Sequence, residues 1–197
     1  KKSKTLSRGI LQGVLGLNIT EKIMEKFIFN FRGKGSKLVE VTIEKNLSYC
    51  QFKELIPDLV SIYQRAYENL PEYRDDSYCK IAAYFSWLWK GDPEGFLVVF
   101  EGNKPVGLLG MHTNWREGKE YLAEIHELVV DPQFQGRGVG KKLIEEAIQI
   151  ALSRGRKKIE LWVGEKNRKA QEFYLHNGFQ EKEQRGIWIR MIEELDL

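Results

Sequence analysis

The most constraining feature of this 197-residue sequence is a glycine-rich loop between an apolar segment and an amphipathic one. Residues 121–130 have the pattern of a buried strand, and Gly136, Gly138 and Gly140 then lead into a segment with helical spacing. The N-terminus of a helix carries free N–H groups and about half a unit of positive charge, and glycines let an anion approach closely. The order of strand, loop and helix therefore predicts a phosphate-binding site.

The spacing within this loop argues against two common phosphate ligands. A P-loop needs a glycine where Gln135 stands and a serine or threonine where Lys142 stands. A dinucleotide-binding loop needs a third glycine, but that position falls on Lys141 or Leu143, depending on the starting glycine. The loop therefore fails the ATP pattern and narrowly misses the NAD pattern.

A third pattern fits in two places. Gln135-x-x-Gly138-x-Gly140 resembles the Arg/Gln-x-x-Gly-x-Gly/Ala signature of the GNAT superfamily of acetyl-CoA-dependent N-acetyltransferases. Residues 167–179, from Asn167 through Tyr174 to Phe179, resemble a second segment of the same family. The resemblance extends over residues 38–197 in element order. It implies an α/β fold with a mixed, mostly antiparallel sheet that has a splayed central strand and flanking helices.

Periodicity in the remainder of the chain predicts an element order consistent with that fold. Pro57 is expected only in the first turn of a helix. The expected strands are 38–43, 96–100, 106–112, 121–130, 159–163 and 186–192, and the expected helices are 52–70, 75–90, 138–153 and 168–176.

Residues 1–37 form a predicted N-terminal extension of uncertain role, and residues 38–197 the acetyltransferase domain. Residues 19–31 show loosely helical spacing, and residues 33–36 have the composition of a linker. The apolar run 10–19 follows a basic start, as in a signal peptide, but Gln12 and Asn18 interrupt it.

Composition narrows the cellular setting. The 31 Lys and Arg residues and 28 Asp and Glu residues give a net charge of only +3, which does not favour a nucleic-acid partner. No apolar run reaches the roughly 20 residues of a membrane span. Cys50 and Cys79 form no metal or redox pattern, so we expect a reduced, cytoplasmic protein without a metal.

The resemblance implies that acetyl-CoA is the co-substrate and that the loop amides bind its pyrophosphate. Asn167 is expected near the pantetheine arm, or as the N-cap of the following helix, or both. Main-chain N–H groups at Leu128, Val129 and Val130 are expected to bind the oxyanion of the reaction. The complete set of expected cofactor-binding residues is Leu128, Val129, Val130, Gln135, Gly136, Arg137, Gly138, Val139, Gly140, Lys141, Asn167 and Tyr174.

Three residues are candidates for the general base that deprotonates an amine. Glu124 ranks first because it lies on the central strand, where some family members place a catalytic glutamate. His126 ranks second because strict strand alternation puts it on the same face, and Glu127 ranks third. A bulge in the strand would change this facing. Glu124 in a cross-strand charge pair, or His126 as a core histidine, remains the alternative.

Tyr174 matches the tyrosine that protonates the departing thiolate in this family. Its ordinary pKa of about 10 exceeds the thiol value of about 8.5, so a hydrogen bond is easier to justify than full proton transfer. Packing beside Phe173 is the alternative role.

The acceptor is expected to be a primary amine, either a small molecule or a peptide. A homodimer is left open. Aromatic and acidic residues suit a cationic amine, and those expected near it are Tyr63, Tyr67, Tyr73, Asp75, Asp76, Tyr78, Tyr84, Trp87, Trp89, Trp115 and Trp188. The alternatives to direct acetyl transfer are a non-catalytic acyl-CoA-binding or regulatory module and a nucleotide-binding protein of another fold.

Overall fold

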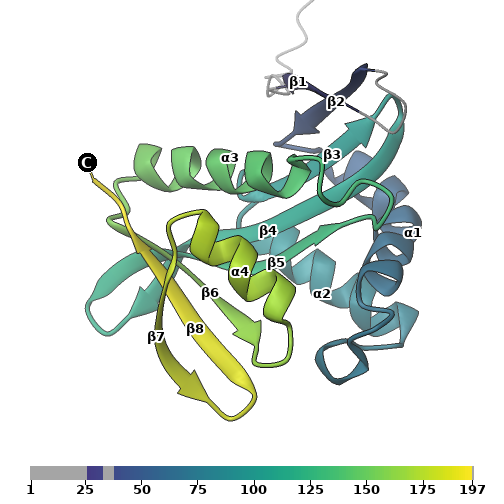
Figure 1. The fold of residues 1–197 in the computed structure, drawn as a ribbon. Coiled ribbons are helices and arrows are strands. Elements are labelled where there is room, and N and C mark those ends of the chain that lie inside the picture. Colours follow the sequence, from purple (N-terminus) through teal and green to yellow (C-terminus); the bar gives the residue numbers. More distant parts are fainter. Residues whose placement is uncertain (1–25, 33–37, 197) are drawn as a thin grey trace, which may run out of the picture.

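A computed structural model describes residues 26–32 and 38–196 (Figure 1). Its strands are β1 (Lys26–Arg32), β2 (Leu38–Glu44), β3 (Phe96–Glu101), β4 (Lys104–Glu117), β5 (Glu120–Val130), β6 (Lys158–Gly164), β7 (Gln180–Arg185) and β8 (Trp188–Glu194). They form one eight-stranded sheet in the order β1-β2-β3-β4-β5-β6-β8-β7. The β5–β6 pair is parallel and the other neighbours are antiparallel. The predicted mixed, mostly antiparallel sheet is confirmed.

Helices cover both faces of this sheet. The helices α1 (Tyr49–Ala66) and α2 (Tyr78–Gly91) lie on one face, and α3 (Val139–Ser153) and α4 (Arg168–His176) lie on the other (Figure 1). A short 3-10 helix, η1 (Pro71–Tyr73), precedes α2. Two hydrophobic cores result, one under α1 and α2 around Phe52 and Phe85, and one under α3 and α4 around Leu143 and Phe179.

The central strands separate part of the way along their length. β5 pairs with β6 at Ala123–Ile125, opposite Ile159–Leu161. Beyond Ile125 the two strands diverge (Figure 1), while β5 stays paired with β4 as far as Val130. β6 in turn stays paired with β8 along its whole length. The predicted splay therefore leaves the C-terminal half of β5 facing a gap in the sheet.

A bulge in β5 lies at the start of this gap. Ile125 is opposite Met111 and Glu127 is opposite Gly110, so His126 is an extra residue in the ladder. Both His126 and Glu127 therefore face α1 and α2. The ring of His126 lies 4.9 Å from that of Trp87 in α2, and Glu127 accepts a hydrogen bond from Tyr67 at the end of α1.

Three expectations about the chain were wrong. Residues 26–32 form strand β1, not a helical segment, and Phe27, Phe29 and Phe31 do recur with the two-residue period of a strand. β7 was missed because its polar sequence and mostly exposed edge position give no apolar alternation. α1 begins at Tyr49, where Ser48 and Gln51 form a capping box, so Pro57 lies inside the helix rather than in its first turn.

Other expectations fall partly outside the described residues. The loosely helical segment before residue 26 and the linker at residues 33–36 are among them.

Cys50 and Cys79 are both exposed and unbridged. Within the ranges that the structure describes, none of the helices has the length and apolar character needed to cross a membrane.

Candidate active site

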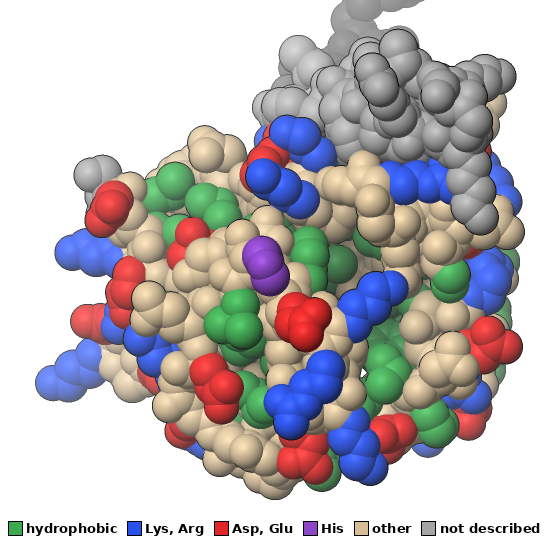
Figure 2. All heavy atoms as spheres, in the orientation of Figure 1, with side chains coloured by type: hydrophobic (Ala, Val, Ile, Leu, Met, Phe, Trp, Pro, Cys, Tyr) green, Lys and Arg blue, Asp and Glu red, His purple; other side chains and the backbone are tan. Residues whose placement is uncertain are grey.

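A large groove opens where the glycine loop enters α3. Its volume is about 780 Å³, and it lies between the end of α1, the end of β5 with the following loop, and α4. Figure 2 shows a hollow with Lys and Arg side chains at its edge beside α4. The cationic residues that line the groove are Arg65, Lys141, Lys166, Arg168 and Lys169.

The loop leaves room for a ligand against its backbone. Gly136 and Gly138 have φ angles of 71° and 87°, a conformation that glycine adopts without strain. A Cβ at either position would meet no heavy atom of the described protein within 4 Å, and Gly138 is the N-cap of α3. A phosphate could therefore reach the free amides at the start of α3, and the cationic rim suits its charge. These features fit the pyrophosphate of coenzyme A.

Side chains fix the loop to the end of β5. The Gln135 Nε2 amide donates to the Val130 carbonyl at 2.9 Å, and the Lys169 ammonium donates to Gln135 Oε1 at 2.6 Å. The Arg65 guanidinium pairs with the buried Asp131 carboxylate at 2.6 Å. These contacts connect α1, the end of β5 and α4 around the groove, so they fix the positions of its three walls relative to one another.

Most of the predicted cofactor-binding residues line this groove. Asn167 does so while its Oδ1 also accepts the Ala170 N–H at 3.2 Å, so both expected roles are compatible. Val139 is instead buried in the core, and Arg137 lies over the Phe134 ring. The groove-lining residues in the predicted set are Leu128, Val129, Val130, Gln135, Gly136, Gly138, Gly140, Lys141, Asn167 and Tyr174. Contact of any of them with coenzyme A stays a prediction.

The wall that α1 contributes to the groove was not predicted from the sequence. Residues 65–70 line the groove because the end of α1 comes up against β5. That approach is a tertiary contact, and no motif in the segment marks it. Tyr67 was expected beside the acceptor instead.

A narrow cavity of about 60 Å³ fills the gap between β5 and β6. It is lined by residues 125–128 of β5 and 161–164 of β6, together with Tyr67, Tyr73, Asn167, Ala170, Tyr174 and Trp188. Tyr67, Leu128 and Tyr174 also line the large groove. The groove and the gap in the sheet therefore share a wall at Tyr174.

Glu127 is the buried acid of this narrow cavity. Its Oε1 accepts a hydrogen bond from the Tyr67 hydroxyl at 3.0 Å. Burial raises the pKa of Glu127 to about 7, although the Tyr67 hydroxyl and the Leu128 amide favour its charged form. Burial, and then the negative charge of Glu127, raise the pKa of Tyr174 well above its usual range. The cavity therefore brings together a carboxyl that titrates near neutrality and a phenol that stays protonated.

A third, outer cavity of about 310 Å³ adjoins the narrow one. Tyr84, Glu124, Ile125, His126, Trp162, Arg185 and Trp188 line it. His126 and Trp188 line both cavities, whereas Glu124 lines the outer cavity alone. The Glu124 carboxylate lies 3.3 Å from His126 Nδ1, and the Tyr84 hydroxyl donates to the His126 carbonyl at 2.8 Å. The two leading candidates for the base thus form one pair, on the outer side of Glu127.

The residues expected near the acceptor fall into two groups. Tyr67, Tyr73, Tyr84 and Trp188 line one or both of the smaller cavities, and Trp87 and Trp115 pack around the His126 ring. The others have different surroundings. Tyr63 is in the core, Trp89 stacks on Phe52, Asp75 and Asp76 pair with Lys80 and Arg74, and Tyr78 is exposed.

Comparison with known proteins identifies the family. The model of the acetyltransferase (GNAT) family matches residues 56–179. An uncharacterized N-acetyltransferase of Methanocaldococcus jannaschii is 42% identical over 145 residues, which are 73% of this chain and 64% of that protein. This chain thus spans just under two thirds of that relative. The chain belongs to the GNAT family, which confirms the resemblance seen in its motifs.

Solved structures agree with this assignment. A crystal structure of a Pyrococcus horikoshii protein matches with a TM-score of 0.71 and 36% identity, covering 80% of this chain and 99% of that one. An N-acetyltransferase of Thermoplasma acidophilum, solved in complex with coenzyme A, shares the fold with a TM-score of 0.60 and 20% identity, covering 79% of this chain and 99% of that one.

The raised pKa of Glu127 has a measurable consequence for stability. Between the unfolded value of about 4.3 and the folded value of about 7, the folded state binds more protons, so the free energy of unfolding should fall as pH rises. The fall in the free energy of unfolding should total about 4 kcal/mol and end above pH 7. Glu127→Gln keeps a side-chain oxygen that can accept the hydrogen bond from Tyr67. This variant should not show the fall in the free energy of unfolding.

Urea unfolding of wild type and variant at pH 4.5, 6 and 8 measures this difference. The exposed Glu68 provides the matched control, because Glu68→Gln should give a curve parallel to that of wild type. Parallel curves for wild type and Glu127→Gln would show that Glu127 titrates normally.

Proposed function

We propose that this protein is an acetyl-CoA-dependent N-acetyltransferase that transfers the acetyl group directly to a primary amine. One observation carries the proposal: Glu127 and Tyr174 line the same narrow cavity, between the loop-side groove and the outer cavity. In the reaction the acetyl C–S bond breaks and a C–N bond forms. The amine loses a proton and the departing thiolate gains one. The family match and the coenzyme A complex of the same fold support acetyl-CoA as the donor.

We assign Glu127, in place of the first-ranked Glu124, as the general base. An ordinary ammonium has a pKa of about 10.4, so transfer of its proton to a carboxylate of pKa about 7 costs about 5 kcal/mol in free-solution terms. Burial lowers the pKa of an amine while it raises that of a carboxylate, so the narrow cavity reduces this difference. Glu124 lines the outer cavity, where its charge suits a bound ammonium.

Tyr174 serves as a hydrogen-bond donor to the departing sulfur. Its raised pKa makes full proton transfer to a thiolate less favourable, but it keeps the phenol protonated in the working pH range. Main-chain N–H groups of residues 128–130, where β5 borders the groove, complete the proposed site for negative charge. In this proposal, Glu127 accepts the proton of the amine, while the Tyr174 hydroxyl and the amides of residues 128–130 donate hydrogen bonds to the negative charge that develops.

The first test measures the binding of acetyl-CoA and its turnover with primary amines. Acetyl-CoA should raise the melting temperature, and a panel of primary amines should release free thiol from it at a rate that follows protein concentration. Stabilisation without thiol release from any amine would favour the non-catalytic acyl-CoA-binding module. Stabilisation by NAD or ATP, with none by acetyl-CoA, would contradict both.

The second test separates the two carboxylates. The kcat/KM of wild type should rise with pH through about 7 as Glu127 ionises. Glu127→Gln should abolish this rise and lower kcat/KM by about 10²- to 10⁴-fold. Glu124→Gln should keep the rise, because Glu124 does not line the narrow cavity. Retention of the rise in Glu127→Gln together with its loss in Glu124→Gln would restore the original ranking.

The third test addresses Tyr174. Tyr174→Phe retains the ring packing against Phe173 and Phe179 and removes the hydroxyl. We expect kcat to fall, by roughly tenfold or more for a hydrogen bond to a charged group, with the Kd for acetyl-CoA nearly unchanged. An unaltered kcat would limit Tyr174 to packing.

A further inference from the structure

We propose that the acceptor is a linear aliphatic amine that carries at least one further ammonium group, a diamine or polyamine, and that it binds along the open sheet face of β6, β8 and β7. This proposal rests on the proposed function and names its substrate class. Three observations carry it: the charge of that face, the exposed tryptophans beside it, and the small volume of the cavity that Glu127 lines.

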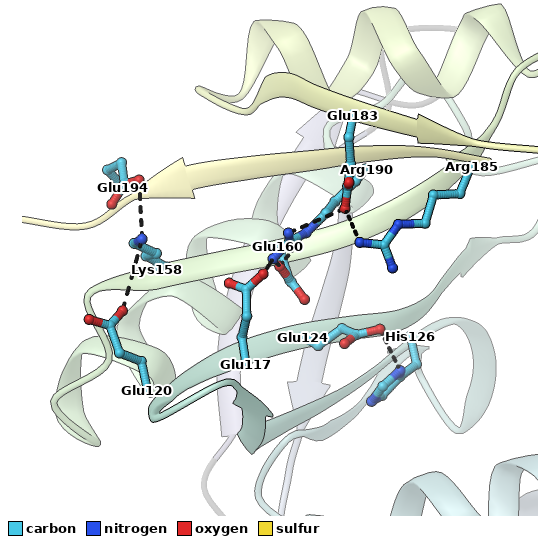
Figure 3. Close-up of polar contacts among 10 residues, drawn as sticks. All are labelled: Glu117, Glu120, Glu124, His126, Lys158, Glu160, Glu183, Arg185, Arg190 and Glu194. Carbon is cyan, nitrogen blue, oxygen red and sulfur yellow. Dashed lines mark hydrogen bonds and ion pairs between the residues drawn. The ribbon is translucent and has the colours of Figure 1, made fainter.

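The face has an excess of carboxylates. Among the residues labelled in Figure 3, the glutamates outnumber the Lys and Arg side chains; these residues are Glu117, Glu120, Glu124, Glu160, Glu183 and Glu194, with Lys158, Arg185 and Arg190. Arg190 is shared by Glu117, Glu160 and Glu183, and Arg185 also pairs with Glu183, so two cations face three anions. Glu124 lies opposite Glu160 on the adjacent strand. Adjacent strands are about 4.8 Å apart, so these carboxylates form a row that suits several ammonium groups separated by short methylene chains.

Aromatic rings border the acidic row. Trp87, Trp115 and Trp188 are 44%, 38% and 38% exposed. Burial of so large an apolar ring would stabilise the fold, so three exposed tryptophans around one cavity are unusual. Trp188 lines the outer cavity, and Trp87 and Trp115 pack on the His126 ring that lines it too. Ring faces attract ammonium groups, and their apolar surface covers methylene groups between them.

His126 supplies an independent sign of a ligand. Its side chain is 9% exposed, and its Nε2 has no hydrogen-bond partner in the part of the chain that the structure describes. A buried polar atom without a partner is costly. His126 lines both the outer and the narrow cavity. A bound amine that passes from one cavity to the other would supply the missing partner.

The narrow cavity selects against branching. Its volume of about 60 Å³ equals that of only a few water positions, and the rings of Tyr73, Trp162 and Trp188 help to line it. An unbranched methylene chain with a terminal amine suits so small a volume. The α-amine of an amino acid or a peptide N-terminus carries a branch at the adjacent carbon, and is the poorer fit.

A matched pair of acceptors tests the charge. 1,5-Diaminopentane and 1-aminopentane share the reacting end and differ in the distal group. We expect the kcat/KM of the diamine to exceed that of the monoamine by roughly tenfold at low salt, the size of two or three exposed charge interactions, and the ratio to shrink as salt is added. Alaninamide, whose amine carries a branch at the adjacent carbon, and a peptide with a single lysine complete the panel.

Variants then locate the effect. Glu117→Gln and Glu183→Gln change partly exposed side chains, so the fold should tolerate both. Each should lower the kcat/KM of the diamine more than that of the monoamine, so that the diamine-to-monoamine ratio falls by about two- to fivefold. Glu172→Gln, on an exposed position of α4 across the sheet, is the matched control and should leave the ratio as in wild type.

The outcomes are distinguishable. Three results would each overturn the polyamine proposal while leaving the acetyltransferase intact. They are equal kcat/KM for the diamine and the monoamine, a higher value for alaninamide or the lysine peptide than for the diamine, and an unchanged ratio in both glutamate variants. Absence of thiol release with every amine would overturn the proposed function itself.

Discussion

The separation of β5 from β6 is the constraint on which the rest of the site depends. If the two strands had stayed paired beyond Ile125, their main-chain groups would have satisfied one another, and no gap would reach through the sheet. Because they diverge, the C-terminal half of β5 presents its edge to the groove on one side and the narrow cavity on the other. β4 and β8 hold the outer edges of the two strands, so the gap remains open without disrupting the sheet.

The bulge at His126 gives this gap its chemistry. Strict alternation would put Glu127 on the opposite face from Glu124 and His126, under α3 and α4. The extra residue turns Glu127 toward α1, where Tyr67 meets it. Burial then shifts the pKa of the carboxyl and of the surrounding phenols in the same direction, upward, because each loses the solvation of its charged form. One backbone irregularity therefore places a neutral-pH acid and protonated phenols in one cavity.

The sequence was informative where the local chain determines the structure. Gly136 and Gly138 need a positive φ in any loop of this kind, and Asn167 begins a helix by a local hydrogen bond, so the loop and α4 were predictable. The order of Glu124, His126 and Glu127 as candidate bases depends instead on the ladder between β4 and β5. A bulge there is a property of two strands together, and no pattern within residues 121–130 reveals it. The wall formed by residues 65–70 is missing from the prediction for the same reason.

Positive and negative side chains lie on different sides of the gap between β5 and β6, and the net charge of the sequence does not show this separation. A net charge of +3 over 197 residues says little about any partner. Yet five Lys and Arg side chains line the groove proposed for the phosphate-bearing donor. On the other side of the gap, the glutamates labelled in Figure 3 outnumber the Lys and Arg side chains drawn with them. Opposite fields on the two sides would attract an anionic donor and a cationic acceptor to different entrances, so that neither competes for the other's site. In the proposed mechanism the reacting groups meet in the narrow cavity, where Glu127 is the buried carboxylate proposed to take the proton.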